Sequence, residues 1–214
     1  MKESLIKAVF TLTLLFGVLL SLLAQNHFPS QIWHKGNIYG TDRQTYAGLV
    51  KYDLENNLIQ LQTETISTFT ASNVSHFEIH NATNDGIRSF YSLPYKQNGN
   101  NETLVFFEVL TEGNDIALFC REYIETYYNN LGTRGWVSNH IMGAQKFTGY
   151  RLAFNYYFFK NGRIERYSLK RKDLFAMLPR HDEEIDLFMR KNSLEHDRRR
   201  DLIRITAYYN ELQH

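Results

Sequence analysis

The chain has 214 residues, 24 basic and 23 acidic side chains, and 43% hydrophobic residues, which is enough length for one domain with a substantial core. Its 15 phenylalanines and 14 tyrosines exclude a disordered tail and favour a sheet over a helical bundle. The nearly balanced charge gives no electrostatic basis for a nucleic-acid partner.

Residues 1–24 are predicted to be a secretory signal peptide. Lys2 and Lys7 form a basic start, and the sixteen residues from Ala8 to Leu23 carry no charge. Sixteen helical residues span about 24 Å, less than the roughly 30 Å hydrocarbon core of a bilayer. A cleaved signal is therefore favoured over the alternative, a retained membrane anchor. We expect an exported chain that begins near Gln25 and has no membrane span.

Residues 25–169 are predicted to form a β-rich body of about ten strands. Alternating and β-branched segments are separated by turn signals such as Asn56-Asn57 and Asn161-Gly162, because Asn and Gly tolerate a positive φ. The expected strands are residues 33–39, 46–54, 58–63, 65–70, 74–80, 88–95, 104–110, 116–127, 150–159 and 164–169. This succession indicates a small barrel or meander sheets.

Residues 129–148 interrupt the strand rhythm and are predicted to be a surface loop. They contain several Asn and Gly residues, with Trp136 and His140 between them, and show no alternation. Loops on a rigid scaffold often carry function, and Trp is enriched at binding hot spots. Trp136 and His140 are therefore the candidate binding residues. In the alternative interpretation Trp136 folds back and seals the core.

Residues 170–214 are predicted to form a helical C-terminal cap of two or three helices. A first helix is expected over residues 173–178, where Pro179 ends it, and a second begins at the acidic residues 182–184. Helices this short are stable only when they pack on the sheet or on one another. The predicted fold class is therefore mainly β (α+β), with the helices packed against the strands.

A third helix is expected to start near Asp197. Leu202 and Ile205 lie on its apolar stripe and are expected to be buried. The basic residues 198–200 alternate with acidic ones nearby, which is typical of a solvated helix face. An anionic or lipid surface is the alternative partner for these arginines.

The sequence resembles a group of exported Gram-negative bacterial proteins of unknown function, with a β-rich body and a short helical tail. The resemblance is carried by residues 33–38 (WHKGNI), 48–53 (GLVKYD), 69–71 (FTA) with Val74 and 77–79 (FEI), and in the tail by residues 172–174 (KDL), 189–192 (MRKN), 201–202 (DL) and 208–210 (YYN). It implies export to the periplasm or outer cell surface and a β-plus-helix architecture, and it implies no activity.

His76, Glu78 and His80 form the candidate metal site. Residues two apart on a strand share a face, so these side chains would point together while Phe77 and Ile79 point into the core. Two histidines and a carboxylate can bind zinc or iron. The alternative is the polar side of a half-buried strand, which gives the same pattern without a metal.

Cys120 is the one cysteine of the chain, so no internal disulfide can form. Its apolar neighbours favour a buried small hydrophobe over a nucleophile paired with a distant histidine. The sequence contains neither a Gly-x-Ser-x-Gly elbow nor a phosphate-binding loop.

These patterns favour a non-enzymatic envelope protein that binds a partner protein or supports an assembly, with no cofactor. One alternative is a metal-dependent hydrolase of unrecognised type that uses His76, Glu78, His80 and His140. The other is a small-ligand binding protein with a cleft between the β body and the helices. We expect the partner to be an envelope protein or a small ligand, and not nucleic acid.

Overall fold

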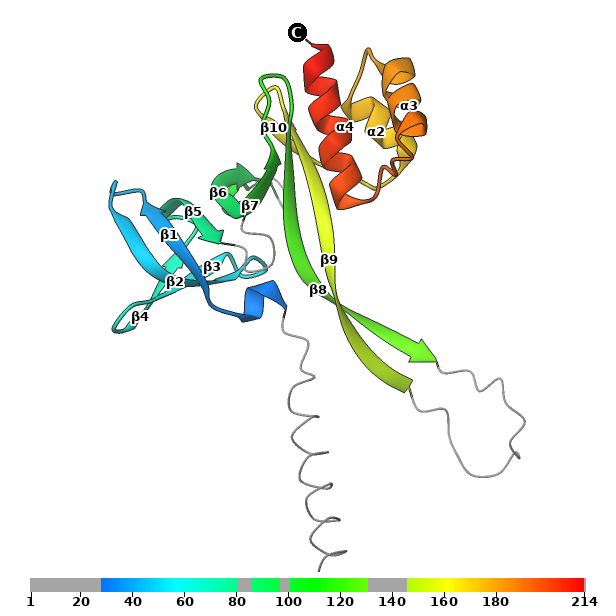
Figure 1. The fold of residues 1–214 in the computed structure, drawn as a ribbon. Coiled ribbons are helices and arrows are strands. Elements are labelled where there is room, and N and C mark those ends of the chain that lie inside the picture. Colours follow the sequence, from blue (N-terminus) through cyan, green and yellow to red (C-terminus); the bar gives the residue numbers. More distant parts are fainter. Residues whose placement is uncertain (1–27, 81–85, 97–100, 131–145, 214) are drawn as a thin grey trace, which may run out of the picture.

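A computed structural model describes residues 28–80, 86–96, 101–130 and 146–213 (Figure 1). Ten antiparallel strands form a single sheet, and three α-helices follow them near the C-terminus. The prediction of a mainly β fold of about ten strands with C-terminal helices is confirmed. The predicted signal peptide and the candidate binding residues Trp136 and His140 lie outside the described residues.

A short 3-10 helix, η1 (Pro29–Gln31), precedes the sheet. The strands are β1 (His34–Gly40), β2 (Thr45–Asp53), β3 (Leu58–Gln62), β4 (Ile66–Thr70), β5 (Val74–His80), β6 (Ile87–Tyr95), β7 (Thr103–Thr111), β8 (Ala117–Asn130), β9 (Lys146–Lys160) and β10 (Arg163–Arg166). The helices are α2 (Arg171–Met177), α3 (Asp182–Lys191) and α4 (Arg199–Leu212). Each predicted strand and helix is present, with its ends shifted by up to four residues.

The strands follow the order β10-β9-β8-β7-β6-β5-β1-β2-β3-β4, and the half that contains β1 to β6 curls into a barrel-like unit (Figure 1). Glycine allows part of this curvature, because a Cβ at Gly36 would collide with the carbonyl oxygen of Glu78 on the adjacent strand. The hydroxyl of Ser92 on β6 donates to the carbonyl of Ala71, which follows β4. This bond joins the far end of the sheet back to its middle.

The concave face of the sheet carries two apolar cores. The first fills the barrel-like unit and consists of Ile38, Val50, Tyr52, Leu54, Ile59, Leu61, Ala71, Val74, Phe77, Ile79, Phe90 and Phe106. The second lies beneath the helices and includes Ile116, Leu118, Cys120, Tyr156, Phe158, Leu174, Ile185, Met189, Leu202, Ile205 and Tyr209. The helical cap therefore shares its core with β8 and β9 and packs on the strands as predicted.

Helix α4 is the main contact between the cap and the sheet. Leu202 and Ile205 are fully buried, as expected from their helical spacing. The Asn210 side chain donates to the carbonyl of Ile116 at 3.0 Å and covers Gly113, where a Cβ would collide with it. A small residue in the turn between β7 and β8 thus allows the helix to approach closely.

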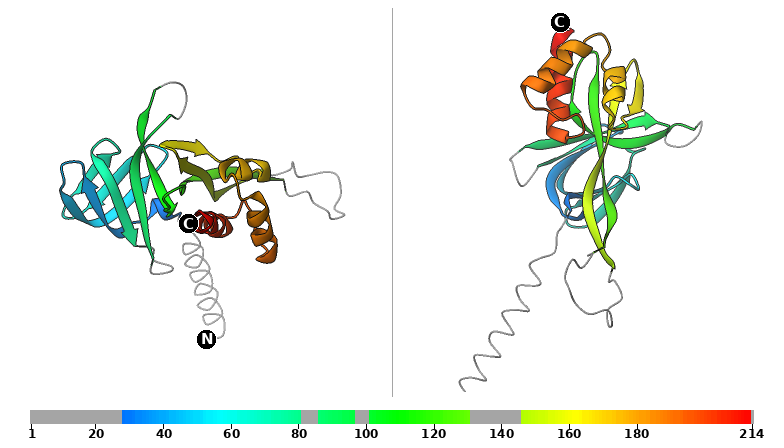
Figure 2. Two further views of the ribbon diagram at one scale, coloured as in Figure 1. Left: turned by 90° about the horizontal axis from the view of Figure 1, so that it is seen from above. Right: turned by 90° about the vertical axis from the view of Figure 1, so that its right-hand side faces the viewer.

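The β8–β9 hairpin is longer than predicted. Pairing continues to Asn129 opposite Phe147 and Asn130 opposite Lys146, so both ends of the predicted loop 129–148 are strand. Antiparallel pairing with a long partner outweighs the low strand propensity of Asn at these ends. The hairpin runs away from the helical cap, and Figures 1 and 2 show it projecting past the barrel-like unit.

Candidate functional site

A buried ionic network separates the two cores on the concave face. On β7, the alternate residues Phe106, Glu108 and Leu110 pass from the barrel core through the network to the helical core. The network consists of Tyr52 on β2, Arg88 on β6, Glu108 on β7, Glu122 on β8 and Arg199 on α4. It connects strands and a helix that are far apart in the sequence.

Arg88 lies at the centre of this network. Its Nε and one terminal nitrogen donate to the two Glu108 oxygens at 2.8 and 2.9 Å. That same terminal nitrogen donates to Glu122 at 2.8 Å, and the other donates to the Tyr52 hydroxyl at 2.9 Å. The Tyr52 hydroxyl in turn donates to Glu122. Two carboxylates therefore balance the charges of Arg88 and Arg199.

Burial and pairing act against each other on these groups. Burial alone would raise the pKa of Glu108, but hydrogen bonds and charge from Arg88 and Arg199 outweigh it and lower that pKa. Burial also works against the charge on Arg88, yet its contacts with Glu108 leave its pKa raised. Burial raises the pKa of Tyr52. These shifts favour a charged Glu108 carboxylate and a charged Arg88 guanidinium beside a protonated Tyr52 phenol.

Arg199 corrects the expectation of a solvated arginine cluster. It donates to Glu108 at 2.6 Å, and its guanidinium lies over the Phe154 ring at 5.4 Å. Arg199 is three residues before Leu202, so both lie on the same helix face. Arg198 is four residues before Leu202, so helical spacing alone does not single out Arg199. In the structure Arg198 is the extended residue that precedes α4, and both it and Arg200 are exposed.

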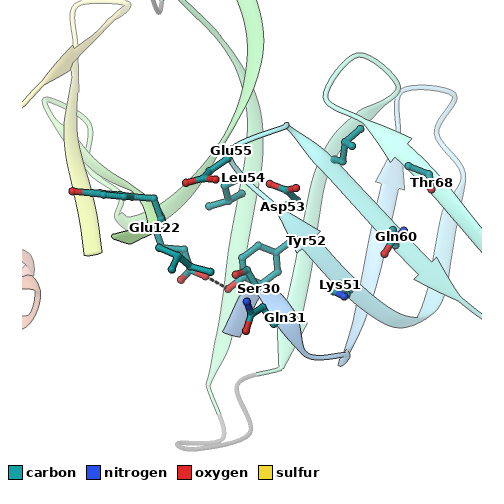
Figure 3. Close-up of a pocket in the computed structure, with 13 residues that line it drawn as sticks. Ser30, Gln31, Lys51, Tyr52, Asp53, Leu54, Glu55, Gln60, Thr68 and Glu122 are labelled. Atoms are coloured by element: carbon teal, nitrogen blue, oxygen red, sulfur yellow. Dashed lines mark hydrogen bonds between the residues drawn. The ribbon is translucent and has the colours of Figure 1, made fainter. Parts of the chain in front are cut away.

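A groove of about 360 Å³ opens beside the network, between the barrel-like unit and the root of the hairpin (Figure 3). It is lined by Ser30, Gln31, Lys51, Tyr52, Asp53, Leu54, Glu55, Leu58, Gln60, Thr68, Glu122, Tyr123 and Ile124. Small-molecule sites commonly have volumes of about 300–1,000 Å³. The groove is therefore large enough for a small ligand. The sequence did not indicate any of its residues as a candidate site residue.

One wall of the groove is a row of polar side chains across three strands. Lys51 on β2 pairs with Gln60 on β3, and Gln60 pairs with Thr68 on β4. Paired residues of antiparallel strands point to the same face. The row stands on the outer surface of the barrel-like unit, since the intervening Ile59 and Leu61 are buried in its core.

The hairpin is a two-stranded ribbon beyond its root. β7 pairs with β8 only as far as Cys120, so the following residues of β8 pair with β9 alone. Tyr128 and Tyr150 lie on one face of the ribbon and are 69% and 60% exposed. Ile124 and Leu152 are half-buried on the same face, nearer the root. We call these four residues the tyrosine face.

The opposite face of the ribbon is occupied by contacts within the hairpin. Arg151 donates to Glu125 at 2.7 Å and lies over the Tyr127 ring at 5.8 Å. The Tyr127 ring covers Gly149, where a Cβ would lie 2.5 Å from it. An aromatic ring over a strand glycine compensates for the missing side chain. The side chains of this face contact one another, although Tyr127 and Arg151 are also exposed. Tyr128 and Tyr150 on the tyrosine face are the more exposed tyrosines of the described hairpin.

No family model, curated protein or solved structure matches this chain. In the described residues, no helix is both long and apolar enough to cross a membrane.

The residues of the candidate metal site share a face as predicted, with Phe77 and Ile79 fully buried behind them. His76 stacks between the rings of Tyr39 and Tyr91, at centroid distances of 4.0 and 5.0 Å. Burial between these rings lowers the pKa of His76.

Glu78 accepts a hydrogen bond from the Tyr39 hydroxyl at 3.4 Å, and His80 is exposed. Within the part of the chain that the structure describes, no three His, Cys, Asp or Glu side chains are grouped to hold a metal ion. The metal-site hypothesis stays a prediction, which elemental analysis of the purified protein tests.

Cys120 is fully buried in the core beneath the helices. Burial raises the pKa of its thiol, so the reactive thiolate is disfavoured. The expectation of a buried small hydrophobe is confirmed.

Proposed function

We propose that this protein is an exported, non-enzymatic binding module of the bacterial cell envelope, and that the tyrosine face of its hairpin contacts a partner protein. The observation that carries the proposal is the exposure of Tyr128 and Tyr150, on a ribbon that no other described strand or helix covers.

The energetics of a two-stranded ribbon support a bound partner. An isolated two-stranded hairpin is marginally stable in water, and an added layer on one face stabilises it. Tyrosine combines a large apolar ring with a polar hydroxyl, which makes it frequent at protein interfaces. The two exposed tyrosines have this chemistry on a face that has no partner within the described chain.

The hairpin is held firmly where it leaves the body. Arg121 and Glu122 at its root are buried, and Glu122 belongs to the ionic network. The Arg121 guanidinium donates to the carbonyl of Leu54 in the barrel-like unit. A rigid scaffold that presents an exposed element is the usual arrangement for binding. The predicted binding residues Trp136 and His140 lie outside the described residues and stay a separate prediction.

Export is supported by the sequence. The basic start and the uncharged residues 8–23 match a secretory signal. The resemblance to exported Gram-negative proteins favours the periplasm or the outer cell surface.

Site-specific photocrosslinking tests the proposed contact. A photoreactive amino acid is placed at Tyr150 in one variant and at Leu187 of α3 in a control variant, because Leu187 is 68% exposed but lies on the helical cap. After irradiation of intact cells of the native host, the Tyr150 position should give one discrete protein adduct that the Tyr128→Ala substitution removes. Identical adducts at both positions, or none at Tyr150, would contradict the proposal.

A further inference from the structure

We infer that the groove beside the ionic network binds a neutral, hydroxyl-rich ligand of the size of a mono- or disaccharide. This site and the tyrosine face share Ile124, but the other residues of the groove lie outside the tyrosine face. The inference rests on the chemistry of the two groove walls, on the balance of charges that line the groove, and on the buried residues that hold part of its shape.

The polar wall offers both donors and acceptors to a ligand. The Lys51 ammonium donates, whereas the Gln60 amide and the Thr68 hydroxyl can each donate and accept. Neighbouring strands lie about 4.8 Å apart, so the three side chains can reach different hydroxyls of one sugar ring. Hydroxyl groups also donate and accept, which makes them complementary to such a mixed row.

The facing wall is partly apolar. Tyr123 and Ile124 belong to this wall and come from the root of the hairpin. Leu54 and Leu58 add apolar surface where the polar row ends. A sugar ring has a C–H face as well as hydroxyl edges, and the C–H face packs on an aromatic or aliphatic surface. One polar wall and one partly apolar wall thus match the two kinds of surface that a saccharide presents.

The charges of the groove disfavour ionic ligands. Asp53, Glu55 and Glu122 line it together with Lys51, so an anion would meet a surplus of carboxylates. Two of these carboxylates are already engaged. Asp53 accepts from the backbone and side chain of Asn56 at 3.0 and 2.8 Å, and Glu122 accepts from Tyr52 and Arg88. Asn56 is neutral, so Asp53 keeps its charge. A cation would nevertheless meet positive charge as well as carboxylates, because Lys51 lines the groove and Arg88 contacts Glu122.

Part of the groove is held in place before a ligand arrives. Tyr52 and Leu54 are buried in the barrel core, and the Tyr52 hydroxyl is held by Arg88 and Glu122. A preformed site loses little conformational entropy on binding, which favours even a small ligand.

Saturation-transfer NMR on the exported chain tests the inference, with maltose, cellobiose and N,N′-diacetylchitobiose as neutral probes and spermidine as a cationic probe. The Gln60→Ala variant removes the centre of the polar row. Gln62→Ala is the matched control, because Gln62 is a half-buried glutamine on the same strand and face that does not line the groove. Circular dichroism establishes that both variants are folded.

We expect at least one neutral disaccharide to bind the wild-type chain and the Gln62→Ala variant, and to bind Gln60→Ala at least fivefold more weakly. The Tyr128→Ala variant should bind the sugar as the wild type does, which separates this site from the tyrosine face. The inference would be overturned by binding of spermidine alone, by no binding of any neutral probe, or by equal binding to Gln60→Ala and Gln62→Ala.

Discussion

Glu108 holds the two halves of the concave face together, because it accepts hydrogen bonds from Arg88 of the β6 strand and from Arg199 of the helical cap. Buried charges are costly to remove from water and are tolerated when they are paired. The members of the network also fix how the barrel-like unit, the hairpin root and helix α4 meet. Removing a member of the network should therefore lower the free energy of unfolding, and should do so more than a change on the exposed hairpin.

Substitution of Glu108 by Gln should lower the free energy of unfolding by about 3–5 kcal/mol, because the half-buried guanidinium groups of Arg88 and Arg199 lose their shared, buried carboxylate. Glu125→Gln is the control, since Glu125 pairs with the exposed Arg151 on the hairpin and exposed pairs contribute little. Urea unfolding of both variants gives the comparison. Equal losses at the two positions would show that the network is not a stabilising element.

The lowered pKa of Glu108 also predicts a pH dependence. The native state favours the charged carboxylate more than the unfolded state does, where the pKa is near the ordinary value of 4.5. This stabilisation is complete above that value and is lost as the pH falls through the lower native pKa. The urea midpoint of the wild type should therefore fall more steeply on acidification than that of Glu108→Gln. If the urea midpoints of the two proteins fell in parallel, ionisation of Glu108 would not be the cause of the pH dependence.

Period-two alternation correctly predicted which side chains of β5 are buried, because the signal is local to one strand. The ionic network has no such signal, since Tyr52, Arg88, Glu108, Glu122 and Arg199 come from five separate elements. Each residue has an ordinary context in the sequence. The order of the strands and the packing of α4 on the sheet bring them together.

Among the elements, the strands and helices were predictable and their arrangement was not. Turn residues such as Asn57 and Asn161, both with a positive φ in the structure, mark hairpins directly. The pairing of β1 with β5 joins strands that are separated by three others. The length of the β8–β9 hairpin also depends on a partner strand, so a loop was predicted at residues that are paired.

The packing of helix α4 on the sheet can be tested by substitution. Leu202→Ala should lower the free energy of unfolding by about 2–5 kcal/mol, because Leu202 is fully buried between the helix and β-strand residues of the second core. Arg200→Ala on the exposed face of the same helix should change it by no more than about 0.5 kcal/mol. Chemical denaturation measures both. Similar losses at the two sites would mean that the helix packs through a different face.

For the molecule as a whole, export is the prediction on which the envelope function depends. If the signal is cleaved as the sequence indicates, the chain in the envelope fraction should begin at or near Gln25. Intact-mass spectrometry of the protein isolated from that fraction decides the point. A mass equal to that of all 214 residues would show that the N-terminal segment is retained.

In the proposed function, the two cores and the ionic network act as a rigid body that presents the hairpin to a partner. The most direct measurement is a comparison of stability and crosslinking in the Tyr128→Ala, Tyr150→Ala double variant, with the photoreactive group moved to Thr126 on the same face. We predict an almost unchanged urea midpoint, because both tyrosines are exposed, together with loss of the discrete adduct. A large fall in the midpoint with the adduct intact would contradict this account, because the tyrosine face would then stabilise the fold without binding a partner.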